Sequence, residues 1–355
     1  MISSQIRTML RPVLWLMIAG LASCAEAQSS FEIFKSPTVS YHLVRSYSIG
    51  GSYTWQGIAL DSEQRRIYLA HYNRVEVVDE DSGSRVSDIL ETPDVRAIAI
   101  ASDLNRGFTA NGGADARRTG DSGSVTVFDT TTLKALARVA VNPPESIVYD
   151  LLTHRVFPLN QKTTVIDGRS NEKVGEVDLG GQPSGALSDG RGTVFVNLSD
   201  KRALAVIDAK TLQVSKVFPI HCAGPHSLAY DSREQRLFIG CDDGHLYVID
   251  AVTGKFVNRV QMCSGVDGSG YDPDARLVFQ ACDEGVISVI HENATDAYDI
   301  IDTVKTALWA SAMAFDPKTK AIYLPTADYV PIPGKDDPTR ERLAPGTFRL
   351  LLVSP

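Results

Sequence analysis

The chain has 355 residues, of which 43% are hydrophobic and 22% are charged, and its formal net charge at pH 7 is −8. This hydrophobic content is ample for a packed core and excludes an intrinsically disordered chain. The negative charge repels a phosphate backbone, so general nucleic-acid binding is disfavoured.

Residues 1–27 are predicted to be a signal peptide, followed by a linker over residues 28–40. Arg7 and Arg11 form the basic start of this signal, and residues 12–22 form an apolar stretch that is too short to span a bilayer. The chain is therefore expected to leave the cytoplasm. Removal of the signal leaves 33 basic and 42 acidic residues, a net charge of −9.

Two processing routes stay open for this segment. The sequence Ala-Glu-Ala at 25–27 is an A-x-A cleavage site and predicts a protein released into the periplasm. The sequence Leu-Ala-Ser-Cys at 21–24 resembles a bacterial lipobox and predicts lipidation of Cys24, which would tether a lipoprotein to the cell envelope. A lipid on Cys24 is the only membrane attachment that we expect.

From residue 41 onward, one pattern recurs about every 40 residues. An apolar run ends at an anchor position that is Asp in six of seven units, and a turn and a second hydrophobic run follow. The anchors are Asp61, Ala101, Asp150, Asp189, Asp231, Asp272 and Asp316. A third run, which usually also ends in Asp, and a fourth run complete most units. Four short strands per repeat predict the blade of a β-propeller, with the Asp residues as turn residues.

The number of strands predicts how the ring closes. Seven first strands are present, but only six of them are followed by a fourth strand, and the missing one is supplied by residues 41–49. The chain end, residues 348–353, supplies the third strand of blade seven. We therefore predict an all-β, seven-bladed propeller over residues 41–355, with four antiparallel strands per blade, closed by pairing of the N-terminal strand with the C-terminal blade.

Several segments carry a family resemblance. The sequence FVNLSDKRALAVID at 195–208 resembles the YVTN propeller repeat. Residues 303–306, 316–327 and 345–353 are similar to the closing blade of exported bacterial YncE-like proteins, although no blade contains the letters YVTN. The resemblance covers roughly residues 40–355 and implies a seven-bladed exported propeller, and it assigns no catalytic residue.

Four cysteines lie beyond the predicted signal peptide and form two pairs, Cys222 with Cys241 and Cys263 with Cys282. Each pair places one member before a first strand and one at the end of the second strand, on the same rim of one blade. An even count in an oxidising compartment favours two disulfides within blades. Pairing of Cys241 with Cys263 across neighbouring blades stays open.

A zinc site is the alternative interpretation of the same region. His221 and His226 lie near Cys222, but zinc needs four converging ligands, and the four cysteines are divided between two separate blades. We predict no bound metal and no cofactor.

Candidate binding residues lie at the rim where the innermost strands begin. The residue five positions before each anchor is polar in every blade, and the next residue is small. The polar residues are Gln56, Arg96, Glu145, Ser184, His226, Asp267 and Ser311. They predict a polar mouth around the central channel, although simple solvation of the rim explains them too.

Two long loops are expected over the same face. Residues 111–123 carry Arg117 and Arg118, and residues 327–346 carry two aspartates and two arginines: Asp336, Asp337, Arg340 and Arg342. Loops of this length are often binding elements.

No enzyme class is indicated clearly. A metal-dependent lactonase could use Glu145 and Asp267, but no Asn joins them on the ring. A quinoprotein would need more than the three tryptophans present. Ser184, His226 and Asp267 could form a triad only across blades, without a nucleophile elbow.

We therefore predict a non-catalytic, monomeric propeller that binds a small polar ligand, glycan, peptide or partner protein at its loop-rich face. A metal-dependent, lactonase-like hydrolase is the first alternative. DNA binding, which is implied by the YncE-like resemblance but opposed by the charge, is the second.

Overall fold

The described part of the chain forms seven four-stranded antiparallel sheets and one two-stranded hairpin, which confirms the predicted fold class. The computed structural model describes residues 34–35, 37, 39–51, 55–112, 123–331 and 341–355. Helical structure within these ranges consists of two short 3-10 turns, η1 (Ser102–Leu104) and η2 (Ser199–Lys201). No helix among the described residues is both long enough and apolar enough to cross a bilayer.

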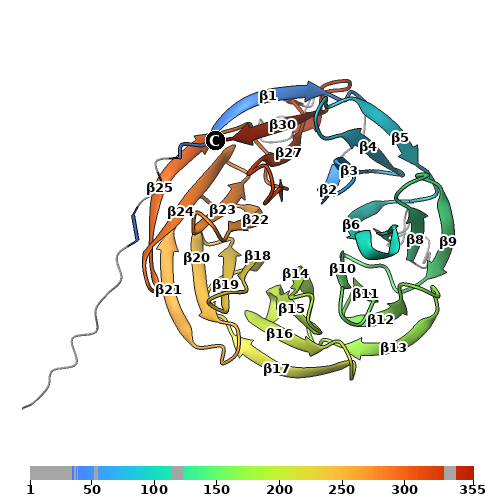
Figure 1. The fold of residues 1–355 in the computed structure, drawn as a ribbon, viewed down its shortest axis with the longest axis horizontal. Helices are drawn as coiled ribbons and strands as arrows, with labels where there is room; N and C mark the ends of the chain where they lie inside the picture. Colours follow the sequence, from blue (N-terminus) through green and yellow to red (C-terminus); the bar gives the residue numbers. More distant parts are fainter. Residues whose placement is uncertain (1–33, 36, 38, 52–54, 113–122, 332–340) are drawn as a thin grey trace, which may run out of the picture. The chain divides into compact units, whose positions relative to one another are not determined.

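The blades follow one another around a central channel, with the first strand of each blade innermost (Figure 1). Blade one consists of β2 (Trp55–Asp61), β3 (Arg66–His71), β4 (Arg74–Asp79) and β5 (Arg85–Ile89). Blade two consists of β6 (Val95–Ala101), β7 (Arg106–Asn111), β8 (Ser124–Asp129) and β9 (Ala135–Ala140). Blade three consists of β10 (Ser146–Asp150), β11 (Arg155–Leu159), β12 (Lys162–Asp167) and β13 (Lys173–Asp178). Blade four consists of β14 (Pro183–Ser188), β15 (Thr193–Leu198), β16 (Ala203–Asp208) and β17 (Gln213–Pro219). Blade five consists of β18 (Pro225–Asp231), β19 (Arg236–Cys241), β20 (His245–Asp250) and β21 (Phe256–Gln261). Blade six consists of β22 (Val266–Asp272), β23 (Leu277–Cys282), β24 (Val286–Ala294) and β25 (Ala297–Lys305).

Blade seven is shared by the two ends of the chain. It contains β26 (Ala314–Phe315), β27 (Ile322–Thr326), β30 (Arg349–Ser354) and β1 (His42–Ser48), in that order outward. β1 pairs antiparallel with β30, with His42 opposite Ser354 and Ser48 opposite Arg349 (Figure 1). The predicted closure is therefore confirmed, and it covers the backbone edge that β30 would otherwise expose. A separate hairpin of β28 (Tyr329–Pro331) and β29 (Glu341–Leu343) lies between β27 and β30 in the chain.

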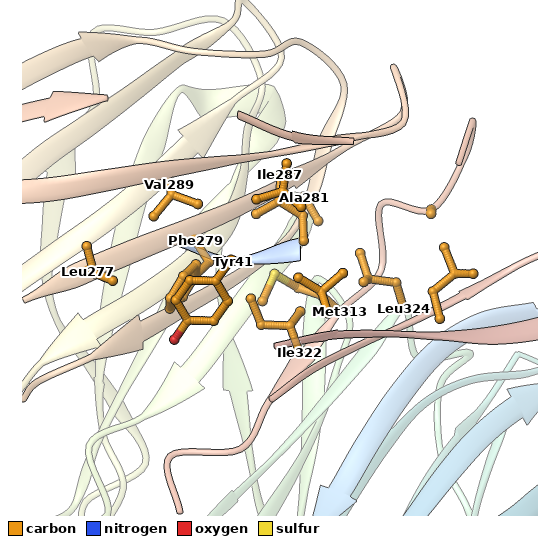
Figure 2. Packing of buried hydrophobic residues seen from close by; sticks show 13 residues of the cluster. Tyr41, Leu277, Phe279, Ala281, Ile287, Val289, Met313, Ile322 and Leu324 are labelled. Carbon is orange, nitrogen blue, oxygen red and sulfur yellow. The ribbon is translucent and has the colours of Figure 1, made fainter. Parts of the chain in front are cut away.

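Alternating apolar residues of adjacent blades form the core between the sheets. Between blades six and seven, Tyr41 is only 4% exposed and its ring meets that of Phe279 edge-on at 4.8 Å. Figure 2 shows this ring among Met313, Ile322 and neighbouring aliphatic side chains. The N-terminal segment therefore seals the ring with a buried side chain as well as with backbone pairing.

The aspartates of the repeat act as turn residues, as predicted. Asp61 accepts hydrogen bonds at Oδ1 from the backbone N–H groups of Glu63 and Gln64, at 3.0 and 3.1 Å. Asp208, at the end of a third strand, accepts from Lys210 and Thr211 at 2.8 and 2.9 Å. These bonds stabilise the turns on the face opposite the predicted polar mouth.

The arginines that begin second strands connect neighbouring blades. Arg106 donates from Nη1 to the carbonyls of Gly168 and Arg169 in blade three, both at 2.7 Å. Arg155 reaches from blade three to the carbonyls of Ala209 and Lys210 in blade four in the same way. The arginine at the start of a second strand, which looks like an ordinary strand residue in the sequence, therefore connects adjacent blades.

A buried pair of carboxyl groups, Glu80 and Asp316, lies where blades one and seven meet. Glu80 is 1% exposed, and it accepts a hydrogen bond from the Tyr323 hydroxyl at 3.2 Å. Arg65 Nη1 lies 3.2 Å from Glu80 and 3.6 Å from Asp316. Burial first, and the charge of Asp316 second, raise the pKa of Glu80 to about 7.

This pair predicts a pH-dependent stability. The folded pKa of Glu80 is above its ordinary value of 4.5, so its stabilising contribution is full below pH 4.5 and is lost as the pH rises towards 7. Between pH 4.5 and 7.5 the wild type should lose on the order of 3 kcal/mol of unfolding free energy through this group. Glu80→Gln should abolish that loss, which urea unfolding at each pH would measure. The exposed Glu63→Gln should retain the wild-type pH profile, and identical profiles for both variants would contradict the assignment.

Candidate functional site

One large cavity opens at the rim where the innermost strands begin, and we call it the mouth cavity. Its volume is about 860 Å³, and residues from all seven blades line it. Of the seven predicted ring residues, six line this cavity: Gln56, Arg96, Glu145, Ser184, His226 and Asp267. Ser311 does not, because it is 7% exposed and the following residues, Ala312 and Met313, face the cavity instead.

The small residue after each polar position allows neighbouring inner strands to approach closely. A Cβ atom on Gly57 would lie 2.7 Å from the carbonyl oxygen of Arg96, and one on Gly185 would lie 1.8 Å from that of His226. Gly268 has the same relation to the carbonyl of Ser311, at 2.6 Å. Any larger residue would force the blades apart at the channel.

On the side of the mouth cavity formed by blades two and three, two carboxylates neutralise the positive charge of Arg96. Arg96 donates from Nε and Nη2 to Asp94 Oδ2 at 3.2 and 3.1 Å, and from Nη1 to Glu145. The Arg96 side chain is 19% exposed and Glu145 is 38% exposed. Two carboxylates therefore share one guanidinium, which leaves this side with a net negative charge.

The opposite side of the cavity, formed by blades five and six, is acidic. His226 Nδ1 lies 3.4 Å from Asp267 Oδ1, and both side chains remain about 40% exposed to the cavity. Burial raises the pKa of Asp267 and that of Asp242, the charge of Asp283 raises both further, and His226 opposes these shifts. The electrostatic field of these aspartates therefore favours a bound proton or a ligand group that donates a hydrogen bond.

Two disulfides, Cys222–Cys241 and Cys263–Cys282, lie in blades five and six, the blades that form this acidic side. Their Cα atoms are 6.2 and 6.0 Å apart, and each bond closes a loop of 19 residues within one blade. The within-blade pairing is therefore confirmed, and the pairing of Cys241 with Cys263 is wrong. Disulfides of this kind favour an oxidising compartment.

Sequence reasoning missed several residues that shape the cavity. Asp94, Gln182, Ser199 and Asp242 also line it. For Asp242 a signal was present: Cys241 and Cys282 are each followed by Asp, an acidic residue and Gly. The backbone N–H of each such Asp donates to a glycine of the preceding connection, Asp242 to Gly224 at 3.1 Å.

The residues named for the catalytic and metal alternatives make other contacts in the structure. The Ser184 hydroxyl donates to the Pro225 carbonyl at 2.7 Å. Glu145 and Asp267 already pair with Arg96 and His226. Among the described residues, no group of three or more His, Cys, Asp or Glu side chains is arranged to hold a metal ion.

The remaining predicted residues lie outside the described part of the chain. These are Cys24, Arg117, Arg118, Asp336, Asp337 and Arg340. Arg342 belongs to β29, but its side chain is not described.

Comparisons of this chain with known proteins support its fold. No family model matches the chain, and no curated protein matches it by sequence. Among solved structures, a chain of the hydrazine synthase of Kuenenia stuttgartiensis is similar, with a TM-score of 0.65 and 14% sequence identity over 78% of this chain and 93% of that chain. At this identity the likeness supports the propeller fold and assigns no family and no activity.

Proposed function

We propose that this chain is an exported, non-catalytic propeller of the YncE-like type that binds a small polar ligand, or a polar group of a glycan, peptide or partner protein, in its mouth cavity. The observation that carries the proposal is the cavity itself. Its volume of about 860 Å³ lies within the range of small-molecule sites, and polar side chains from successive blades converge on it.

The chemistry of the cavity indicates which ligands fit. Four carboxylates line it, those of Asp94, Glu145, Asp242 and Asp267, and an ionised carboxylate accepts hydrogen bonds but donates none. Among the described residues, Arg96 is the arginine that lines it, and it is already paired with Asp94 and Glu145. A ligand with hydroxyl or ammonium donors is therefore favoured, and phosphate-bearing or carboxylate-bearing ligands are disfavoured.

Asp267→Asn tests this assignment by replacing an acceptor-only carboxylate with an amide of the same shape. The purified chain would be titrated calorimetrically with putrescine, sorbitol and inorganic phosphate as probes. We expect the first two classes to bind and phosphate not to bind, and we expect Asp267→Asn to weaken binding by about tenfold or more, or 1.4 kcal/mol.

A matched control is Glu176→Gln on the outer strand β13, which removes one exposed carboxylate far from the mouth cavity. It should bind like the wild type. Preferential binding of phosphate, or equal effects of the two variants, would refute the proposal. A stoichiometric divalent ion retained by Glu145, His226 or Asp267 would favour the hydrolase instead, and a DNA affinity with a steep salt dependence would favour the nucleic-acid alternative.

A further inference from the structure

The chain contains three tryptophans, and two of them contact the same tyrosine. Trp15 belongs to the predicted signal peptide, whereas Trp55 and Trp309 both contact Tyr329. The ring centroids of Trp309 and Tyr329 are 5.9 Å apart, and those of Trp55 and Tyr329 are 6.4 Å apart. We call these three side chains the aromatic platform.

The surrounding structure holds the platform in place. Trp55 stacks on the fully buried Phe348 at 5.1 Å with an interplanar angle of 23°. The backbone N–H of Trp309 donates to the carbonyl of Asp283 at 2.9 Å, and the buried Thr326 hydroxyl donates to the carbonyl of Leu308 at 3.1 Å. A surface that is fixed in advance loses little conformational entropy when a ligand binds.

Trp309 is exposed, which is unusual for a residue of this size, whereas Trp55 and Tyr329 are half-buried. Trp309 is 45% exposed and its neighbour Leu308 is 64% exposed. Core packing therefore does not explain the position of Trp309, although it explains most of Trp55. Exposed, rigid aromatic rings are the side chains that contribute most to binding surfaces.

Residues close to Trp55 and Trp309 in the chain line the mouth cavity. Gln56, which follows Trp55 in the chain, lines the cavity, and so does Ala312, three positions after Trp309. The Asp283 carbonyl that holds Trp309 belongs to the acidic turn next to Asp267. A ligand could therefore contact an aromatic face and carboxylate acceptors together.

We propose that the aromatic platform and the mouth cavity form one carbohydrate-binding site, in which a pyranose ring stacks on Trp309 and its hydroxyl groups donate to the cavity carboxylates. This inference rests on the proposed function, because the polar half of the sugar occupies the mouth cavity. A pyranose has an apolar face of C–H groups, which suits the electron-rich face of an indole, and an edge of hydroxyl donors, which suits acceptors.

Other ligand classes match this combination less well. A nucleotide also stacks on aromatic rings, but its phosphate would meet the acidic side of the cavity. A peptide strand carries a backbone carbonyl for every backbone N–H group, and those carbonyls would face the carboxylates of the acidic side. An alkylammonium ion would suit both the rings and the carboxylates, so it is the competitor that the experiment must separate.

The test uses the tryptophans as reporters, since both tryptophans outside the predicted signal peptide lie in the platform. The purified chain would be titrated with cellohexaose, maltohexaose, the hexamer of N-acetylglucosamine and tetramethylammonium chloride, each to 10 mM. We expect a saturable change in tryptophan emission with at least one saccharide. Calorimetry would then compare Trp309→Ala with Phe256→Ala, which removes a 51% exposed ring on the outer strand β21.

We expect Trp309→Ala to weaken saccharide binding at least tenfold, with an unchanged melting temperature, and Phe256→Ala to have no effect. Saccharide binding that survives Trp309→Ala but is lost in Asp267→Asn would overturn the platform and leave the proposed function standing. Binding lost in Trp309→Ala but unaffected by Asp267→Asn would retain the platform and remove the mouth cavity from the proposed function. Saturation by tetramethylammonium alone, or by none of the four probes, would overturn the carbohydrate assignment.

Discussion

Tyr41→Ala is expected to lower the free energy of unfolding by about 3–5 kcal/mol, the range found when a large aromatic side chain is removed from a core. The ring is 4% exposed and packs against Phe279 between blades six and seven (Figure 2). Its loss leaves a cavity at the place where the first strand of the chain closes the propeller. Urea unfolding followed by circular dichroism measures the change.

Two variants separate packing from backbone pairing at this closure. Tyr41→Phe retains the ring and should cost far less than Tyr41→Ala. Leu43→Ala removes a 41% exposed side chain from β1 and should change the stability by less than about 1 kcal/mol. If Tyr41→Ala unfolds at the same urea concentration as Leu43→Ala, the buried seal is not a major source of stability.

Replacing both cysteines of either disulfide by alanine is expected to cost about 3 kcal/mol. Each bond closes a 19-residue loop, and cross-linking a loop of that length reduces the entropy of the unfolded chain by about this amount. The pairs lie in separate blades, five and six, so the two losses should be nearly additive. Urea midpoints of the double variants and of the quadruple variant measure this.

Reductant provides the control for the disulfide prediction. Wild-type protein treated with dithiothreitol should unfold at a lower urea concentration, whereas the quadruple variant should be unaffected by it. The Cys222→Ala, Cys241→Ala variant should also weaken ligand binding, because Asp242 directly follows Cys241 and lines the mouth cavity. An unchanged midpoint for reduced wild-type protein would show that the bonds contribute little.

The fold could be derived from the sequence because propeller blades are local structures. Each blade is a run of consecutive antiparallel strands with short turns, so spacing, alternation and Asp positions reveal it. The closing pair of β1 and β30 joins distant segments, yet it followed from the absence of one fourth strand. The cysteine pairs were predictable for the same reason, since both members of each pair lie in one blade.

The polar ring was also placed largely by repetition. Six of its members line the mouth cavity because equivalent positions in a closed ring face the same channel. Ser311 was the exception, since the inner strand of blade seven, β26, comprises only Ala314 and Phe315, and Ser311 is buried before that strand begins. Repetition predicts the average blade and fails where one blade is irregular.

Composition, repeat spacing and strand count determined the seven-bladed ring, its closure and the face of the polar mouth, because these depend on neighbours in the chain. Only the tertiary structure decided that Arg96 is shared by Asp94 and Glu145, that Glu80 meets Asp316, and that Trp55 and Trp309 both meet Tyr329. Most of those contacts join side chains of different blades or of a blade and a connecting segment, separated by up to 274 positions. Side chains with no shared periodicity meet only once the ring has closed.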